Sequence, residues 1–193
     1  MTPIHTPAVL DAPVLDAVAE RWSTRIFDAE TPIDEKALAS ALEAARWAPS
    51  AANTQPWRFI VARRGSAAHE ALAASLMDFN RAWAPSAGAL LVVLAETVKD
   101  DGSPLAWAAY DAGQAAAYFS LQAHAEGLHT HQMGGFDRAS IVRVFALDPT
   151  TEPLTVIAVG ALGDPAAASE ELRTRESAPR TRRPIADSLI VDA

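Results

Sequence analysis

The feature that most limits the fold of this chain is a continuous apolar run at residues 89–95, with the sequence Ala-Leu-Leu-Val-Val-Leu-Ala. A short, uninterrupted run of this kind is typical of a strand that is buried on both faces. Other elements must therefore cover both of its sides. The run is far too short to cross a bilayer as a helix. The 193 residues, half of them hydrophobic, suffice for one domain with a substantial core.

The composition excludes several classes of protein. A net charge of -8 argues against a general nucleic-acid binder, because such a chain has no room for a dominant basic face. The absence of cysteine excludes a disulfide framework, a thiolate metal site and a cysteine nucleophile. The start of the chain lacks the basic residues and the continuous apolar segment of a signal peptide. We therefore expect a cytoplasmic protein without a membrane segment.

Periodicity and turn chemistry predict the remaining elements. Strands are expected near residues 57–62, 89–95 and 153–160, and residues 184–191 are a candidate edge strand. Helices are expected in five places: before Arg21, after a cap at Thr31, at residues 67–77, from Pro104 to about Glu126, and after a cap at Asp137. Three of them show one apolar face. The apolar residues are Val14, Leu15 and Val18 in the first helix, Leu38, Ala41, Leu42 and Ala45 in the second, and Ile141, Val144 and Phe145 in the last.

The long helix after Pro104 is unusual because alanines occupy nearly every side of it: Ala108, Ala109, Ala112, Ala115, Ala116 and Ala117. A helix with small side chains all round is expected to be central and closely packed, or to lie at a subunit interface. Asp111 and Gln114 interrupt this pattern, and we assign both a structural role. Residues 1–12 look irregular and loose, and the chain from residue 166 onward is a polar tail.

Arginines are placed where they suit a phosphate. Arg21 and Arg25 flank Ser23, so two guanidinium groups and a hydroxyl are available to one anion. The alternative is a helix end with solvated arginines. Arg180 and Arg182 in the tail alternate and point the same way in an extended chain, although a solvated tail also explains them.

The loop at residues 48–56 collects two prolines, a serine and two amides between a predicted helix and a predicted strand. Asn53 and Gln55 each carry a donor and an acceptor, which suits the edge of a heteroaromatic ring with alternating N–H and C=O groups. The alternative is that Ser50 and Asn53 close a turn.

A second loop is expected at residues 128–137. His129 and His131 share a side if this segment is extended, but no third metal ligand follows at a suitable spacing, so we expect no metal site. Gly134 and Gly135 allow the backbone to approach a ligand closely, or make a turn before the next helix.

Together these motifs resemble the nitroreductase family of flavin enzymes, and the chain resembles its shorter members. The matching segments, in order, are Arg21-x-Ser23-x-Arg25-x-Phe27, Ala48-Pro49-Ser50-x-x-Asn53-x-Gln55-Pro56-Trp57-x-Phe59, Asp111-Ala112-Gly113, Gly134-Gly135-Phe136-Asp137 and Arg180-x-Arg182-x-Pro184. The resemblance implies an α+β domain spanning residues 1–193, with helices on both faces of a mostly antiparallel or mixed sheet in three α-β-α layers. It also implies non-covalent FMN and an obligate homodimer embraced by the tail, residues 166–193.

The resemblance further implies which residues contact FMN. The phosphate and ribityl end would lie against the two arginine-bearing segments, and the loop at residues 48–56 would reach the flavin from the other subunit. The implied contacts are Arg21, Trp22, Ser23, Arg25, Pro49, Ser50, Ala51, Asn53, Asn80, Gly134, Gly135, Arg180 and Arg182. Ala51 stands where many members carry serine. No catalytic side chain and no metal ligand is implied.

The implied reaction is ping-pong transfer of hydride from NADPH or NADH to FMN and then to a nitroaromatic or quinone acceptor. Two alternatives remain open. One is reduction of a small enal or semialdehyde by the same cofactor. The other is a flavin-binding carrier or sensor without turnover.

Overall fold

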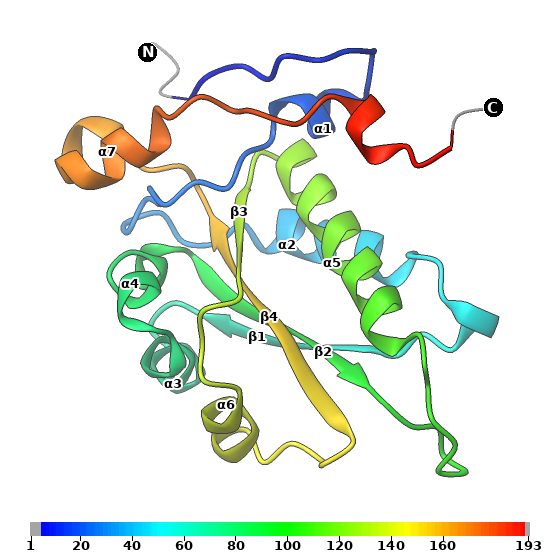
Figure 1. The fold of residues 1–193 in the computed structure, drawn as a ribbon. Coiled ribbons are helices and arrows are strands. Elements are labelled where there is room, and N and C mark those ends of the chain that lie inside the picture. The colour runs from blue at the N-terminus through cyan, green and yellow to red at the C-terminus, as the bar shows by residue number, and fades with distance from the viewer. Residues whose placement is uncertain (1–4, 192–193) are drawn as a thin grey trace.

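The computed structural model describes residues 5–191, and a four-stranded sheet forms its centre (Figure 1). The strands are β1 (Trp57–Arg63), β2 (Ala89–Glu96), β3 (His129–Met133) and β4 (Thr151–Gly160). Their order is β1-β2-β4-β3, and all neighbouring pairs are antiparallel. Residues 89–95 of β2 are all buried, which confirms the expected buried strand.

Helices cover both faces of the sheet, as its two apolar faces require. The longer α-helices are α2 (Glu35–Arg46), α3 (Ala67–Ser75), α5 (Ala108–Ala125), α6 (Arg138–Val144) and α7 (Glu170–Glu176); α1 (Asp16–Glu20) and α4 (Asp78–Arg81) are short. Alternate residues of β2 divide between two clusters. Leu91 and Val93 pack with α2 and α5, and Leu90 and Val92 pack with α3 and α6. The predicted three-layer α+β architecture is therefore confirmed, whereas an embrace of a partner by the tail stays a prediction.

In the helix α2, nearby residues determine both where the helix begins and which of its faces is buried. Its cap is Asp34, whose carboxylate accepts hydrogen bonds from the Lys36 and Ala37 amides, and not Thr31 as predicted. Asp34 caps the helix because it directly precedes the first turn, whereas the Thr31 hydroxyl donates a hydrogen bond to the Asp28 carboxylate. The predicted apolar face is confirmed, since Leu38, Ala41 and Ala45 are buried and Leu42 is partly buried.

Several sequence-based expectations are wrong. The expected loop at residues 128–137 contains strand β3, which pairs with β4 although its residues lack an apolar alternation. Residues 184–191 add no strand and instead include a single turn of 3₁₀ helix at Ile185–Ser188. Val14, Leu15 and Val18 are exposed because α1 has only five residues, too few to lay a face on the core. Val144 is exposed as well.

The helix α5 is covered on one side only. Ala108, Ala112, Ala115 and Ala116 are buried against α2 and the sheet, as expected for close packing. Ala109 and Ala117 are exposed, so the helix is not surrounded within one chain. No helix among residues 5–191 is long and apolar enough to cross a membrane. The parts of the predicted domain at residues 1–4 and 192–193 lie outside the described residues.

Candidate functional site

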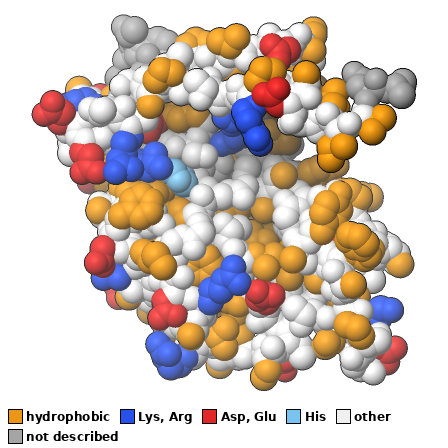
Figure 2. Space-filling model, viewed as in Figure 1, with side chains coloured by type: hydrophobic (Ala, Val, Ile, Leu, Met, Phe, Trp, Pro, Cys, Tyr) orange, Lys and Arg blue, Asp and Glu red, His pale blue; other side chains and the backbone are white. Residues whose placement is uncertain are grey.

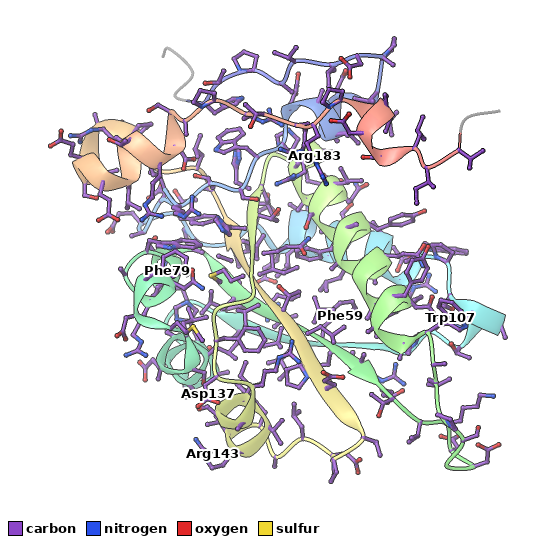
Figure 3. All side chains as sticks on the ribbon, in the orientation of Figure 1. Phe59, Phe79, Trp107, Asp137, Arg143 and Arg183 are labelled. Carbon is purple, nitrogen blue, oxygen red and sulfur yellow. The ribbon has the colours of Figure 1, made fainter. Side chains whose placement is uncertain are left out.

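The arginine cradle is the group Arg21, Ser23, Arg180 and Arg182, which the fold brings to one cavity of about 500 Å³. The cavity lies against the second half of α5 and strand β3, below the segment that carries the tail. Figure 2 shows a hollow at this place with basic side chains at its edge, and in Figure 3 Arg183 extends from the tail toward it. Two arginine-bearing stretches that are far apart in the sequence therefore meet, whereas their contact with a phosphate stays a prediction.

Backbone carbonyl groups hold the cradle together. The Arg180 guanidinium donates to the carbonyl oxygens of Ala19 and Arg21, both at 2.9 Å. The Arg21 guanidinium donates to the Ser23 hydroxyl at 3.0 Å, and its buried Nε has no partner among the described residues. Arg182 is exposed, and its one hydrogen bond within residues 5–191 goes to the neighbouring Thr181 carbonyl. The cradle is thus positioned by the chain and still holds free donors.

The charge of the cradle is uncompensated. The described residues that line its cavity include three arginines and no carboxylate. Burial lowers the pKa of Arg21, and the positive charges of Arg180 and Arg182 lower it further. Guanidinium groups remain charged at any ordinary pH. Such a group of mutually repelling cations is stabilised by an anion, and bidentate N–H donors suit a phosphate.

Trp22 lies behind the cradle and is held by the tail. Its indole Nε1 donates to the Glu176 carboxylate at 2.5 Å, and the other carboxylate oxygen accepts from the Arg25 amide at 3.2 Å. Its ring stacks on His5, with centroids 3.8 Å apart, and meets His129 edge-on. Glu176 is buried and was not predicted from the sequence, which gave no sign that this carboxylate anchors the segment of the arginine motif.

Arg25 does not join the cradle in this chain. It lines a separate cavity of about 480 Å³ with Phe27 and Trp83. Its guanidinium carbon lies 6.0 Å from the centre of the Trp83 ring. The predicted contact of Arg25 with FMN stays a prediction.

Asn80 and Gly135 touch each other at the end of β3. Asn80 is buried, and its side-chain amide donates to the Gly135 carbonyl at 2.9 Å, while its Oδ1 has no partner among the described residues. A Cβ at Gly135 would meet that amide nitrogen at 2.9 Å, so glycine is required for this close contact. A Cβ at Gly134 would meet nothing within 4 Å. The space beside Gly134 is open to a ligand.

The loop at Pro49–Asn53 lies at the other end of α5. The Asp111 carboxylate accepts from the Ala51 amide at 3.0 Å, which confirms the structural role assigned to Asp111. The Ser50 hydroxyl accepts from the Gln55 amide at 3.1 Å, so it closes the turn as the plainer alternative supposed. The Ser50, Ala51 and Asn53 side chains remain available at the surface.

The backbone of this loop is strained. Ala52, Asn53 and Gln55 have φ values of 50°, 56° and 48°, in the left-handed region that residues with a Cβ rarely adopt. Nearby, Trp107 at the start of α5 is 62% exposed and points outward (Figure 3). One chain therefore leaves the loop and its aromatic neighbour uncovered.

The two histidines of β3 share one face, but only the ring of His131 has a hydrogen-bond partner among the described residues. His131 is buried, and its Nδ1 lies 2.8 Å from the Thr24 carbonyl oxygen. His129 is half-buried, and burial, followed by repulsion from His124 and His5, lowers its pKa to about 4. The ring of His131 packs against Trp83, and the ring of His129 packs against Trp22.

Sequence reasoning missed the floor of the cavity. Thr130 and Gln132 of β3 line it together with Ser120 of α5. The Gln132 amide donates to the Ser120 hydroxyl at 3.0 Å, and no described residue donates to its side-chain oxygen. The sequence gave no alternating signal for this face, because residues 129–132 are all polar.

The model of the Nitroreductase family matches residues 18–161. An uncharacterized 15.4 kDa protein of Mycolicibacterium smegmatis is 38% identical over 132 residues, covering 65% of this chain and 88% of its own. A Streptomyces coelicolor protein provisionally named NADH dehydrogenase/NAD(P)H nitroreductase is 32% identical over 152 residues, covering 68% of this chain and 75% of its own.

Among solved structures, one titled as an oxidoreductase containing FMN superposes with a TM-score of 0.88 at 35% identity, over 94% of this chain and 93% of that one. The arginine motif, the Pro49–Asn53 loop and the paired glycines occupy a fold that agrees with these matches. The chain belongs to the nitroreductase family.

Proposed function

We propose that this protein is an FMN-dependent oxidoreductase that takes hydride from NADPH or NADH and reduces nitroaromatic or quinone acceptors. The observation that carries the proposal is the arginine cradle, a group of guanidinium donors that lines a cavity of about 500 Å³ with no carboxylate among the described lining residues. The similarity to a solved oxidoreductase containing FMN supports the identity of the cofactor.

The residues present fit an FMN phosphate. A phosphate monoester carries about -1.5 to -2 charges near neutral pH, and the three arginines of the cradle compensate this charge without a competing carboxylate on the cavity wall. The unpartnered Nε of Arg21 and the Ser23 hydroxyl supply further hydrogen-bonding groups. Thr130 and the free oxygen of Gln132 suit the hydroxyl groups of a ribityl chain.

The ring end of the cofactor would lie where Gly134 leaves open space and Asn80 keeps an unpartnered oxygen. A flavin supplies the hydride acceptor and donor chemistry when it is bound. The chain supplies position: the glycines admit the ring, Asn80 meets a polar edge, and the arginines fix the phosphate. We assign no side chain as acid, base or nucleophile.

The second half of the site would come from another copy of the chain. Pro49, Ser50, Ala51 and Asn53 are at the opposite end of α5 from the cradle, on an uncovered loop. A homodimer that buries this loop, with the tail at residues 166–193 embracing the partner, would complete each site from two chains. A monomer that retains FMN would remove this part of the proposal. The cytoplasmic location also stays a prediction.

The first experiment is the visible absorption spectrum of the freshly purified protein, with the released chromophore identified by mass. Bound FMN is expected. Anaerobic NADPH or NADH should then bleach the flavin, and a nitroaromatic or a quinone should restore the colour. A protein that binds FMN but resists bleaching by both nucleotides is a carrier or sensor, and rapid reoxidation by an enal alone supports the other alternative.

A further inference from the structure

The rim pocket is a second concavity of about 360 Å³ on the tail side of the cradle. Its walls include His5, Trp22, Arg175, Arg180 and Arg182. It shares all four residues of the cradle, and Arg175 of α7 lines the rim pocket but not the cradle cavity. Its volume lies within the range of about 300 to 1,000 Å³ that is usual for small-molecule pockets.

The charge of the rim pocket exceeds what a flavin phosphate needs. Arg21 brings the arginines that line it to four, and Glu176 is the single carboxylate among the described lining residues. Both oxygens of Glu176 already accept hydrogen bonds, from the Trp22 indole and the Arg25 amide. Arg175 also pairs with Glu171 at 3.1 Å, but both side chains are exposed and such a surface pair contributes little. With a phosphate dianion in the cradle, the residues that line the rim pocket still carry a net positive charge, and Arg175 can exchange Glu171 for a second anion.

The same pocket holds a stacking surface. The Trp22 ring lies parallel to the imidazole of His5, with an interplanar angle of 12° and centroids 3.8 Å apart. This face therefore accepts a flat nitrogen heterocycle. His5 reaches it from the N-terminal segment, where the Thr6 hydroxyl donates to the carbonyl of Ser177, the residue after α7, at 3.4 Å. A stacking face beside several arginines suits the base and the phosphates of an adenine nucleotide.

We propose that the rim pocket binds the adenosine half of the hydride donor, with adenine on Trp22 in place of His5 and the 2′-phosphate at Arg175 and Arg182. This inference rests on the proposed function and makes NADPH the preferred donor over NADH. The imidazole of His5 is a displaceable occupant of the adenine position.

The test uses the FMN-loaded protein, so that the cradle is filled, and titrates adenosine 2′,5′-bisphosphate against adenosine 5′-monophosphate by calorimetry. The bisphosphate is expected to bind roughly tenfold more tightly, as an added charge-assisted contact predicts. Arg175→Ala should remove this difference and raise the KM for NADPH, with flavin content and the kcat with NADH unchanged. Arg143→Ala, an exposed arginine of α6, is the control.

His5→Ala gives a second readout that a merely structural residue would not produce. Removal of an intramolecular competitor should tighten bisphosphate binding roughly threefold, whereas loss of a structural contact would weaken it. Equal affinity for the two nucleotides, or an unchanged difference in Arg175→Ala, would overturn the inference while the flavin chemistry stands. A protein that neither keeps FMN nor is reduced by NADPH or NADH would instead remove the proposed function.

Discussion

The two ends of α5 carry the two parts of the candidate site, and they are built differently. At the C-terminal half, the cradle is made by contacts between residues far apart in the sequence, such as Arg180 and the Arg21 carbonyl. At the N-terminal half, the Pro49–Asn53 loop is a local turn with left-handed backbone and one anchor, Asp111. The cradle is complete within one chain, whereas the loop presents its polar groups outward.

This difference indicates which part of the site needs a partner subunit. A strained backbone conformation persists only where the surrounding structure holds it in place, and such positions are often functional. A loop that is strained and uncovered in one chain is therefore expected to be covered in the assembly. The proposal that cradle and loop from different subunits form one site follows from this contrast, and four experiments can break or sharpen it.

The largest effect is expected when two defective variants are mixed. Arg21→Ala damages the cradle, and Asn53→Gly removes the loop amide while it tolerates the positive φ. Each variant alone should be nearly inactive with a nitroaromatic. After joint unfolding and refolding, half of the dimers are mixed and carry one intact site, so about a quarter of the native activity should return. No recovery would mean that both parts serve the same subunit.

Arg21→Ala by itself should weaken FMN binding. The expected loss is roughly 1.5 to 3 kcal/mol, the range for hydrogen bonds to a charged group, and titration of the flavin-free protein with FMN measures it. Arg143→Ala removes an exposed arginine of α6, far from the cradle in Figure 3, and should bind FMN normally. An unchanged affinity in Arg21→Ala would remove this residue from the phosphate site.

Mild acid should lower the free energy of unfolding of the protein, with a contribution from His129 behind the cradle. Burial is the leading cause of a lowered pKa for all five histidines, and the pKa of His129, behind the cradle, falls to about 4. Below pH 6.5 the unfolded chain gains protons that the folded chain does not, so stability falls as the pH decreases toward 4.

The contribution of His129 to this slope is at most about 1.4 kcal/mol per pH unit. Urea unfolding at pH 7 and pH 5 measures it, and His129→Asn should show a smaller difference between the two conditions. Stability that is equal or higher at pH 5 in the original protein would contradict the burial of these rings.

The smallest effect is expected from relief of strain in the loop. Ala52→Gly removes a Cβ at φ 50° and should stabilise the protein by about 1 kcal/mol. Ala39→Gly, at an exposed position in the interior of α2, should instead destabilise by about 0.5 to 1 kcal/mol. Thermal unfolding of both variants checks the signs. Destabilisation by Ala52→Gly would show that the loop conformation is not strained.

The sequence by itself determined the elements whose cause is local. The apolar run of β2 sets a strand covered on both faces, and the spacing of Leu38, Ala41 and Ala45 sets the buried face of α2. The same holds for motif chemistry, because guanidinium and hydroxyl groups at Arg21 and Ser23 suit an anion in any fold. These features depend on a few neighbouring residues, and a pattern records them directly.

The tertiary structure alone decided which of these groups meet. It placed Arg180 on the backbone of Arg21, 159 residues away, and gave Trp22 its buried partner Glu176. It also made a strand of the polar residues of β3 and set Arg25 beside Trp83 instead of in the cradle. These outcomes follow from packing between distant segments, whose free energy depends on the whole chain and leaves no local pattern.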